Sequence, residues 1–417
     1  MTGTVGRLRW LAAGLAVAIV AAACSSATSS DRVARPGSAD AAAVSNDRYT
    51  TPDPSAGVAA VSCGSDVVFG DVPTDLRTDQ LSRYTELVMD GRTVMRFVIG
   101  ADVTDAQVER AVRLTRFYLQ DVPGSAHGTD KSGVRETLAA NNATMVMPNG
   151  AHQEGNDIGL PGQELYAAEI AAEGSPWYVE NDFEHRDAAM EEIFHQVHDV
   201  GIGTNRPGAL PDYQAELLAR AESTAGTVWG IDAADWIDEL RDEGSLAQEY
   251  IAAVIDSWYG LWGPFDGDRG MWGAYVAKTR ADVRVEDPEG AALLQAFLPD
   301  VLEYEAYLDD RFQGTFSLAF DESRPYTHKS QYLRGARLTG ANDAGITGNG
   351  LDNTLRGNGG DNALDGGAGT DTAIYCSARN QYTVTTENDI TTVTGPDGSD
   401  TLSNIETISF IDGSIEL

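Results

Sequence analysis

The segment Gly348–Ile374 reads GNGLDNTLR, GNGGDNALD and GGAGTDTAI, and it decides the fold of the C-terminal part of the chain. These are three consecutive units of nine residues, and a weaker unit, TGANDAGIT, precedes them at residues 339–347. The eighth position of the four units is apolar and holds Ile346, Leu355, Leu364 and Ala373. A fixed short period with one apolar position predicts stacked short strands that bury this row of side chains.

The period resembles the calcium-binding nonapeptide G-G-x-G-x-D-x-U-x of the RTX, or hemolysin-type, family. The resemblance implies a parallel β-roll that binds Ca²⁺, a hard cation that takes about six to eight oxygen ligands. The resemblance implies calcium ligands at the sixth position of the units, which holds Asn353, Asn362 and Asp371. The aspartates at the fifth position, Asp343, Asp352 and Asp361, would compensate in part for the neutral asparagines. Only Asp371 keeps the aspartate of the sixth position, so we expect one or two weakly bound ions. A glycine-rich roll that folds without metal is the alternative.

Short alternating runs follow the repeats, among them QYTVTT, ITTVTG and ETISFIDG. Alternation with a period of two predicts β-strands. Because a stack of repeats needs a terminal cap, we divide this part of the chain into repeats at 339–374 and a β-rich cap at 375–417.

Residues 57–338 combine helix and strand patterns, which predicts an α+β domain with a small mixed sheet. A capping-box pattern, Thr104 with Gln107, opens a predicted helix at 104–120. Strands are predicted at 143–150 and 163–170.

The sequence MEEIFHQVHDVGIG, residues 190–203, contains the residues best suited to chemistry in this domain. On a helix, Glu191, His195 and His198 share one face, and Glu192 lies one step round. The pattern E-E-x-x-H resembles the H-E-x-x-H motif of zincin metallopeptidases, with glutamate in place of the first histidine. The resemblance implies Glu191 and His195 as metal ligands and Glu192 as the catalytic general base.

A second stretch, EYIAAVIDSWY at residues 249–259, is similar to a helix of zincins related to the anthrax lethal factor catalytic domain. The resemblance implies Glu249 as the third ligand of Zn²⁺ or another divalent metal. It also implies a peptide or protein substrate, laid along the predicted strand at 163–170. Ala253 and Asp256 depart from the glutamate and glutamine that are usual at their positions.

The glutamate in place of histidine has chemical consequences. Two carboxylates and one imidazole would cancel the charge of a divalent ion, so its bound water would be less acidic and hydrolysis slower. Oxygen-rich ligands also favour Mn²⁺ or Ca²⁺. The alternative is an ordinary amphipathic helix whose polar face binds no metal. His198 would orient a ligand or face solvent, and His152 and His185 are expected at the surface.

The first 24 residues resemble a bacterial lipoprotein signal, with Arg7 and Arg9 before an apolar run and small residues before Cys24. The resemblance implies cleavage before Cys24 and its lipidation, in an exported cell-envelope or extracellular protein whose only membrane contact is the lipid anchor. Ala21 stands where leucine is usual, and plain cleavage after an A-x-A site is the alternative. Residues 25–56 are rich in Ser, Ala, Asp and Pro, which predicts a disordered tether.

Cys63 and Cys376 are the other two cysteines. In an oxidising compartment they would form one disulfide or remain two free thiols.

The formal net charge of −35 argues against a nucleic-acid partner and suits a protein that binds hard cations. The sequence thus predicts an exported, calcium-binding RTX-type protein with a divergent zincin-like, metal-dependent peptidase domain. The alternative is a non-catalytic calcium-binding surface protein of adhesion type, whose middle domain is structural or interacts with a partner.

Overall fold

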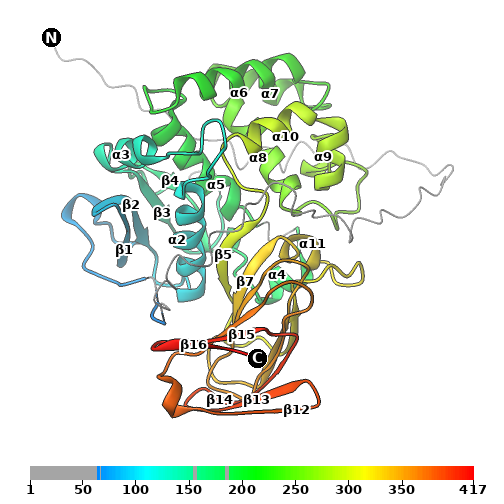
Figure 1. Ribbon diagram of the computed structural model, residues 1–417. Helices are drawn as coiled ribbons and strands as arrows, with labels where there is room; N and C mark the ends of the chain where they lie inside the picture. Colours follow the sequence, from blue (N-terminus) through cyan, green and yellow to red (C-terminus); the bar gives the residue numbers. More distant parts are fainter. Residues whose placement is uncertain (1–62, 66, 154–156, 184–186) are drawn as a thin grey trace.

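The computed structural model describes residues 63–65, 67–153, 157–183 and 187–417. The predicted signal, the lipidation site Cys24, the tether at 25–56 and His185 lie outside these residues. Helices dominate the middle of the chain, and parallel sheets dominate its C-terminal part. This confirms the prediction of a helix-containing middle part followed by parallel β-strands. Figure 1 shows the helical region and the C-terminal sheets at opposite ends of the molecule. Among the described helices, none has the length and hydropathy needed to cross a bilayer.

A mixed sheet of four strands opens the described chain, in the order β1-β2-β3-β4. Its strands are β1 (Arg83–Met89), β2 (Arg92–Ile99), β3 (Thr144–Met147) and β4 (Gln163–Glu164). β1 and β2 are antiparallel, whereas β3 is parallel to both β2 and β4. Asp90 and Gly91 join β1 to β2 with φ angles of 52° and 72°, the positive values that a tight hairpin turn requires. Because β4 is the last strand in this order, it lies at an edge of the sheet.

The predicted strand at 163–170 is wrong beyond Glu164, because a 3₁₀ turn, η2 (Ala167–Glu169), replaces it. Backbone hydrogen bonds from Ala167 to Pro148 and from Ala168 to Gly150 hold this turn beside the chain that follows β3, and side chains bond to it as well. Glu169 Oε2 accepts the Tyr166 N–H at 3.0 Å, and Gln107 Nε2 donates to the carbonyls of Ala167 and Ile170 at 2.7 and 2.9 Å.

The helical region begins with α2 (Asp105–Leu119), where Thr104 and Gln107 form the predicted capping box. The other helices of the described chain are α3 (Ser132–Ala140), α4 (Pro176–Glu180), α5 (Ala189–Gln196), α6 (Pro211–Thr224), α7 (Ala234–Glu243), α8 (Leu246–Trp258), α9 (Arg280–Glu286), α10 (Pro288–Gln295) and α11 (Thr327–Ser330). α5 continues directly into a π-helical segment, η3 (Val197–Gly203). Short 3₁₀ turns are η1 (Thr74–Leu76), η4 (Met271–Gly273) and η5 (Arg379–Gln381).

Two six-stranded sheets form the C-terminal part, in the orders β12-β13-β14-β10-β8-β6 and β16-β15-β11-β9-β7-β5. The strands are β5 (Leu302–Tyr307), β6 (Gly314–Ser317), β7 (Leu333–Arg337), β8 (Ala344–Thr347), β9 (Thr354–Arg356), β10 (Ala363–Asp365), β11 (Thr372–Ile374), β12 (Thr383–Glu387), β13 (Ile390–Gly395), β14 (Gly398–Ser403), β15 (Thr407–Phe410) and β16 (Gly413–Glu416). From β5 to β11, consecutive strands alternate between the two sheets, and neighbours within each sheet are parallel.

The apolar row predicted at the eighth position is buried. Ile346, Leu355, Leu364 and Ala373 are at most 1% exposed. The sheets start earlier than the repeats, because β6 and β7 pair with the repeat strands β8 and β9, and β5 pairs with β7. The predicted repeat boundary at Thr339 therefore falls within the sheets.

The two parts of the molecule share one hydrophobic core, which includes Phe97 in β2 and Phe410 in β15. In Figure 1, α2 lies beside β5, which connects the helical region to the sheets. A disulfide between Cys63 and Cys376 links the start of the described chain to the C-terminal part, with a Cα–Cα distance of 5.6 Å.

Candidate metal centre

Two packed helices place the candidate metal ligands. α5 contributes Glu191 and His195, one helical turn apart, and α8 contributes Glu249 from its first turn. Both glutamates lie in the first turn of their helix, where the N-terminal end of the helix dipole stabilises negative charge. The spacing of the α5 residues and the likeness of residues 249–259 to a ligand helix thus correctly predicted that these three side chains converge.

The geometry of the group suits a divalent cation. One ligand atom from each of Glu191, His195 and Glu249 lies within 4.8 Å of the others. His195 Nε2 is 3.7 Å from Glu249 Oε1. Ligands about 2.1 Å from an ion in tetrahedral geometry are about 3.4 Å apart, so a modest contraction would complete the coordination. All three side chains are buried, and this group can therefore hold a metal ion.

The charges at the site also favour a bound cation. Glu191, Glu192 and Glu249 bring three carboxylates into a region where each residue is at most 6% exposed, beside a single imidazole. Carboxylates that are removed from water together cost free energy unless a cation or proton compensates them. A divalent ion would offset two of the three charges.

Glu192 lies beside the three ligand residues and has two polar neighbours. Its Oε2 accepts a hydrogen bond of 2.6 Å from Gln163 Nε2, and the same oxygen is 3.4 Å from His195 Nδ1. Gln163 lies on the edge strand β4, so the sheet edge and the helix α5 meet at this carboxylate. The contact with Nδ1 leaves Nε2 of the same ring directed at Glu249.

Gln163 and Gln248 were not among the predicted site residues. Gln248 Nε2 donates to the His195 carbonyl at 3.3 Å, which ties α8 to the end of α5. No local pattern marks either glutamine, because each acts across a tertiary contact between segments far apart in the sequence.

A buried network of ion pairs fixes the chain just before α5. Arg110 of α2 forms ion pairs with Glu173 and with Asp187, and its Nη2 lies 2.7 Å from Asp187 Oδ2. Lys329 Nζ is 3.6 Å from the same Asp187 oxygen, and the Tyr304 hydroxyl donates to Glu173 at 2.9 Å. Because Asp187 precedes α5 by two residues, this network fixes the N-terminal end of the helix that carries the candidate ligands.

The remaining histidines have other contacts. His198, in the π-helical segment, is completely buried, and its Nε2 lies 2.5 Å from Gln214 Oε1. Burial lowers the pKa of His198 to about 4, so the ring is neutral near pH 7. Of the two predicted roles of His198, facing solvent is therefore wrong. His152 is partly buried, packs edge-on against Tyr166, and lies 3.9 Å from Asp157.

The predicted calcium ligands at the sixth position of the repeats bond to the turns around them. Asn353 Oδ1 accepts the Asn349 N–H at 2.8 Å, and Asn362 Oδ1 accepts the Asn358 N–H at 2.7 Å. The backbone N–H of Asn353 in turn donates to Asp371 Oδ1 at 2.7 Å. These side chains stabilise the turns through hydrogen bonds within the protein.

The aspartates at the fifth position form a ladder. Asp343 accepts the N–H of Asp361, Asp352 accepts that of Thr370, and Asp361 accepts that of Ser399, each at 2.9 Å. Among the described residues, clusters of three or more metal-binding side chains were found only at Glu191, His195 and Glu249. The repeat aspartates therefore depend on backbone carbonyls or asparagines to complete any ion site.

No protein-family model matches the chain, and no curated protein or solved structure matches it. Its function is therefore inferred from the geometry of the site.

Proposed function

We propose that the chain is a metal-dependent hydrolase, a divergent zincin-like peptidase, with Glu191, His195 and Glu249 as metal ligands. The observation that supports this most strongly is the convergence of these three buried side chains, within 4.8 Å, beside a fourth acidic residue. Two carboxylates and one imidazole suit Zn²⁺ and, because two of the ligands are oxygens, Mn²⁺ as well.

A divalent ion held there would polarise a substrate carbonyl and increase the acidity of a water molecule. Glu192 would accept a proton from that water as its oxygen attacks the peptide carbonyl carbon. The same carboxylic acid would return the proton to the leaving amine as the C–N bond breaks. Water is thus divided between the two products, and Glu192 ends in its starting state. Gln163 would hold the Glu192 carboxylate in place through the 2.6 Å hydrogen bond.

Glu192 has a second candidate role, supported by its position 3.4 Å from His195 Nδ1. A carboxylate beside the distal nitrogen of a ligand histidine orients the ring and increases its basicity. A general base affects turnover, whereas an orienting carboxylate affects metal affinity by about 10- to 100-fold. The two roles therefore differ in what a substitution changes.

The test is Glu192→Gln, with the exposed Glu286→Gln as a matched control. Metal content after loading with Zn²⁺ or Mn²⁺ and cleavage of an unfolded protein such as casein are both measured. If Glu192 is the base, the variant keeps its metal and loses cleavage by at least about a hundredfold. Loss of metal from the variant would support the orienting role, and absence of cleavage by the metal-loaded wild type would reject the peptidase proposal.

For the C-terminal part we propose an RTX-type β-roll with one weak calcium site near Asp371. The Asp371 Oδ2 atom is buried without a hydrogen-bond partner, and Glu406, Asp352 and Asp365 act on it electrostatically. The other repeat turns are stabilised by the asparagine and aspartate hydrogen bonds, so we do not propose an ion in every turn.

The calcium test compares Ca²⁺ with Mg²⁺ by isothermal titration and thermal unfolding. Asp371→Asn should abolish a Ca²⁺-specific increase in Tm, whereas Asp389→Asn, in the β12–β13 turn, should leave it unchanged. No difference between Ca²⁺ and Mg²⁺ in the wild type would favour a roll that folds without calcium.

We further propose that the protein is exported and held at the cell envelope through Cys24, on the sequence of its first 24 residues. Metabolic labelling with a fatty acid, abolished by Cys24→Ser, is the expected result.

A further inference from the structure

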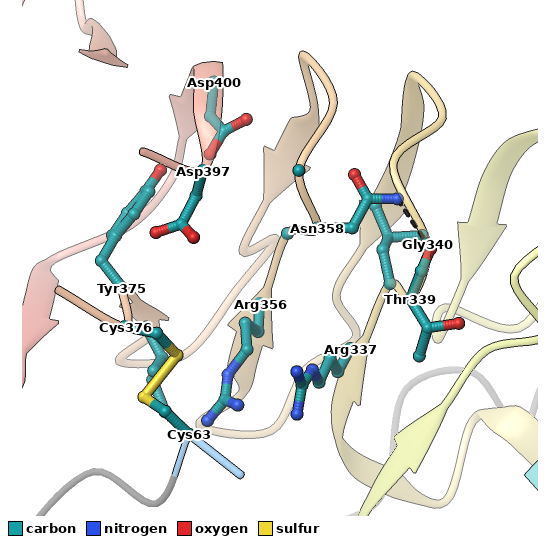
Figure 2. Close-up of a pocket in the computed structure, with 14 residues that line it drawn as sticks. Cys63, Arg337, Thr339, Gly340, Arg356, Asn358, Tyr375, Cys376, Asp397 and Asp400 are labelled. Atoms are coloured by element: carbon teal, nitrogen blue, oxygen red, sulfur yellow. Dashed lines mark hydrogen bonds between the residues drawn. A yellow bond between two sulfur atoms is a disulfide. The ribbon is translucent and has the colours of Figure 1, made fainter. Parts of the chain in front are cut away.

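A pocket of about 210 Å³ opens on the C-terminal sheets, remote in sequence from the candidate metal ligands. The strands β7 and β9, the turn before β14 and the Cys63–Cys376 disulfide contribute to its walls. Figure 2 shows that its charged side chains fall into two groups, with Arg356 and Arg337 side by side in the lower part of the view and Asp397 and Asp400 above them. Its volume corresponds to about seven water molecules, which limits a ligand to a small molecule.

The two arginines form the positive end. Arg337 and Arg356 occupy directly paired positions on β7 and β9, so their side chains leave the same face of the sheet. Like charges at opposed positions on neighbouring strands repel each other. Arg356 Nε has Glu305 Oε1 at 3.7 Å. Among the described residues, by contrast, Arg337 has no ion-pair partner, its Nε is buried without a hydrogen bond, and its guanidinium packs over the Tyr307 ring.

The two aspartates form the negative end. Asp400 is only 1% exposed, its Oδ1 accepts the Asn362 N–H at 2.9 Å, and the Tyr375 hydroxyl, which also lines the pocket, interacts with its carboxylate. Asp397 is partly exposed and accepts a hydrogen bond from the Tyr382 hydroxyl. Among the described residues, Arg337 forms no ion pair with either aspartate, so its charge is not neutralised by the negative end of the pocket.

We propose that this pocket binds a small zwitterion of dipeptide size, with its carboxylate between Arg337 and Arg356 and its ammonium group facing Asp397 and Asp400. Arginine guanidinium groups bind carboxylates through paired hydrogen bonds, and a second arginine on the adjacent strand strengthens the site. Because Arg337 pairs with neither aspartate among the described residues, a ligand that carries both a carboxylate and an ammonium group would match the two kinds of charge in the pocket. An extended chain spans about 3.5 Å per residue, so a dipeptide provides about 7 Å between its ends.

The test uses isothermal titration and thermal shift on the intact chain at pH 7.5, with glycylglycine as the zwitterion. Acetate and methylammonium, at the same concentrations, supply the anion and the cation alone. Glycylglycine should bind and raise Tm, and both single-charge probes should bind at least about tenfold more weakly.

Two variants examine the two ends separately. Arg337→Met should weaken glycylglycine binding at least about tenfold, whereas Arg269→Met, a partly exposed arginine of the helical region, should leave it unchanged. Asp397→Asn keeps an acceptor for the Tyr382 hydroxyl and should also weaken binding. Equal binding of acetate and glycylglycine, or an unchanged affinity in Arg337→Met, would overturn the proposal. So would the absence of glycylglycine binding at a ligand concentration of roughly 20 mM.

Discussion

Replacement of Arg110 by methionine tests how α5 is held in place. The guanidinium of Arg110 lies between Glu173 and Asp187, and these three residues are 2%, 1% and 5% exposed. Arg110→Met keeps the aliphatic bulk, and among the described residues it leaves Lys329 and Tyr304 as the side-chain partners of the two buried carboxylates. Removal of one member of a buried ion pair costs about 3–5 kcal/mol, because the remaining charge stays out of water.

The free energy of unfolding is measured by urea titration, followed by tryptophan fluorescence and by circular dichroism. A matched control is Arg92→Met, since the Arg92–Glu136 pair has a similar length of 3.0 Å but is largely exposed. Exposed pairs contribute about 0–1 kcal/mol, so the control should change stability little. Adding Glu173→Gln to Arg110→Met should recover part of the loss by removing one stranded charge. A loss below about 1 kcal/mol in Arg110→Met would refute the argument that this network anchors α5.

Two further predictions concern the base and a buried lysine. Gln163→Leu should leave the metal content unchanged and lower the rate of peptide cleavage by about 10- to 100-fold, because Glu192 loses the hydrogen bond that positions it. A loss of bound metal as large as the loss of rate would contradict this prediction. Lys131 is completely buried, and burial lowers its pKa to about 7 while its Nζ donates to the Tyr118 carbonyl at 2.9 Å. Since the unfolded chain binds this proton up to a pKa near 10.5 and the folded chain does not, stability should rise as the pH increases from 7 towards 10. Lys131→Met should remove most of that rise in urea unfolding measured at both pH values, and an unchanged slope would show that another group causes it.

The sequence predicted those features that a local period or motif encodes. The buried row at Ile346, Leu355, Leu364 and Ala373 follows from a nine-residue period, because each repeat places the same position inward. The Glu191 and His195 pairing follows from helical geometry, and Glu249 was found through a second motif. In each case neighbouring residues carry the information.

Features that depend on tertiary contacts were missed. The strands β5, β6 and β7 have no glycine period, yet β6 and β7 pair with the repeat strands β8 and β9, and β5 pairs with β7. Gln107 of α2 fixes the turn that replaces the predicted strand at 163–170, although it lies far from that strand in the sequence. The hydrogen bonds that Asn353 and Asn362 make within their turns likewise depend on the conformation of the turns, which the repeat pattern alone does not specify.

The most direct test of the central claim is the metal content of the purified chain after loading with Zn²⁺ or Mn²⁺ and exhaustive dialysis. Elemental analysis should find about one tightly held ion per chain in the wild type and in Glu286→Gln, because three protein side chains suffice for a site with an open position. His195→Ala and Glu249→Ala should each lose that ion, since each removes one of three ligands that lie within 4.8 Å of one another. A wild type that holds neither metal, or a Glu249→Ala variant that holds it as tightly, would contradict the account.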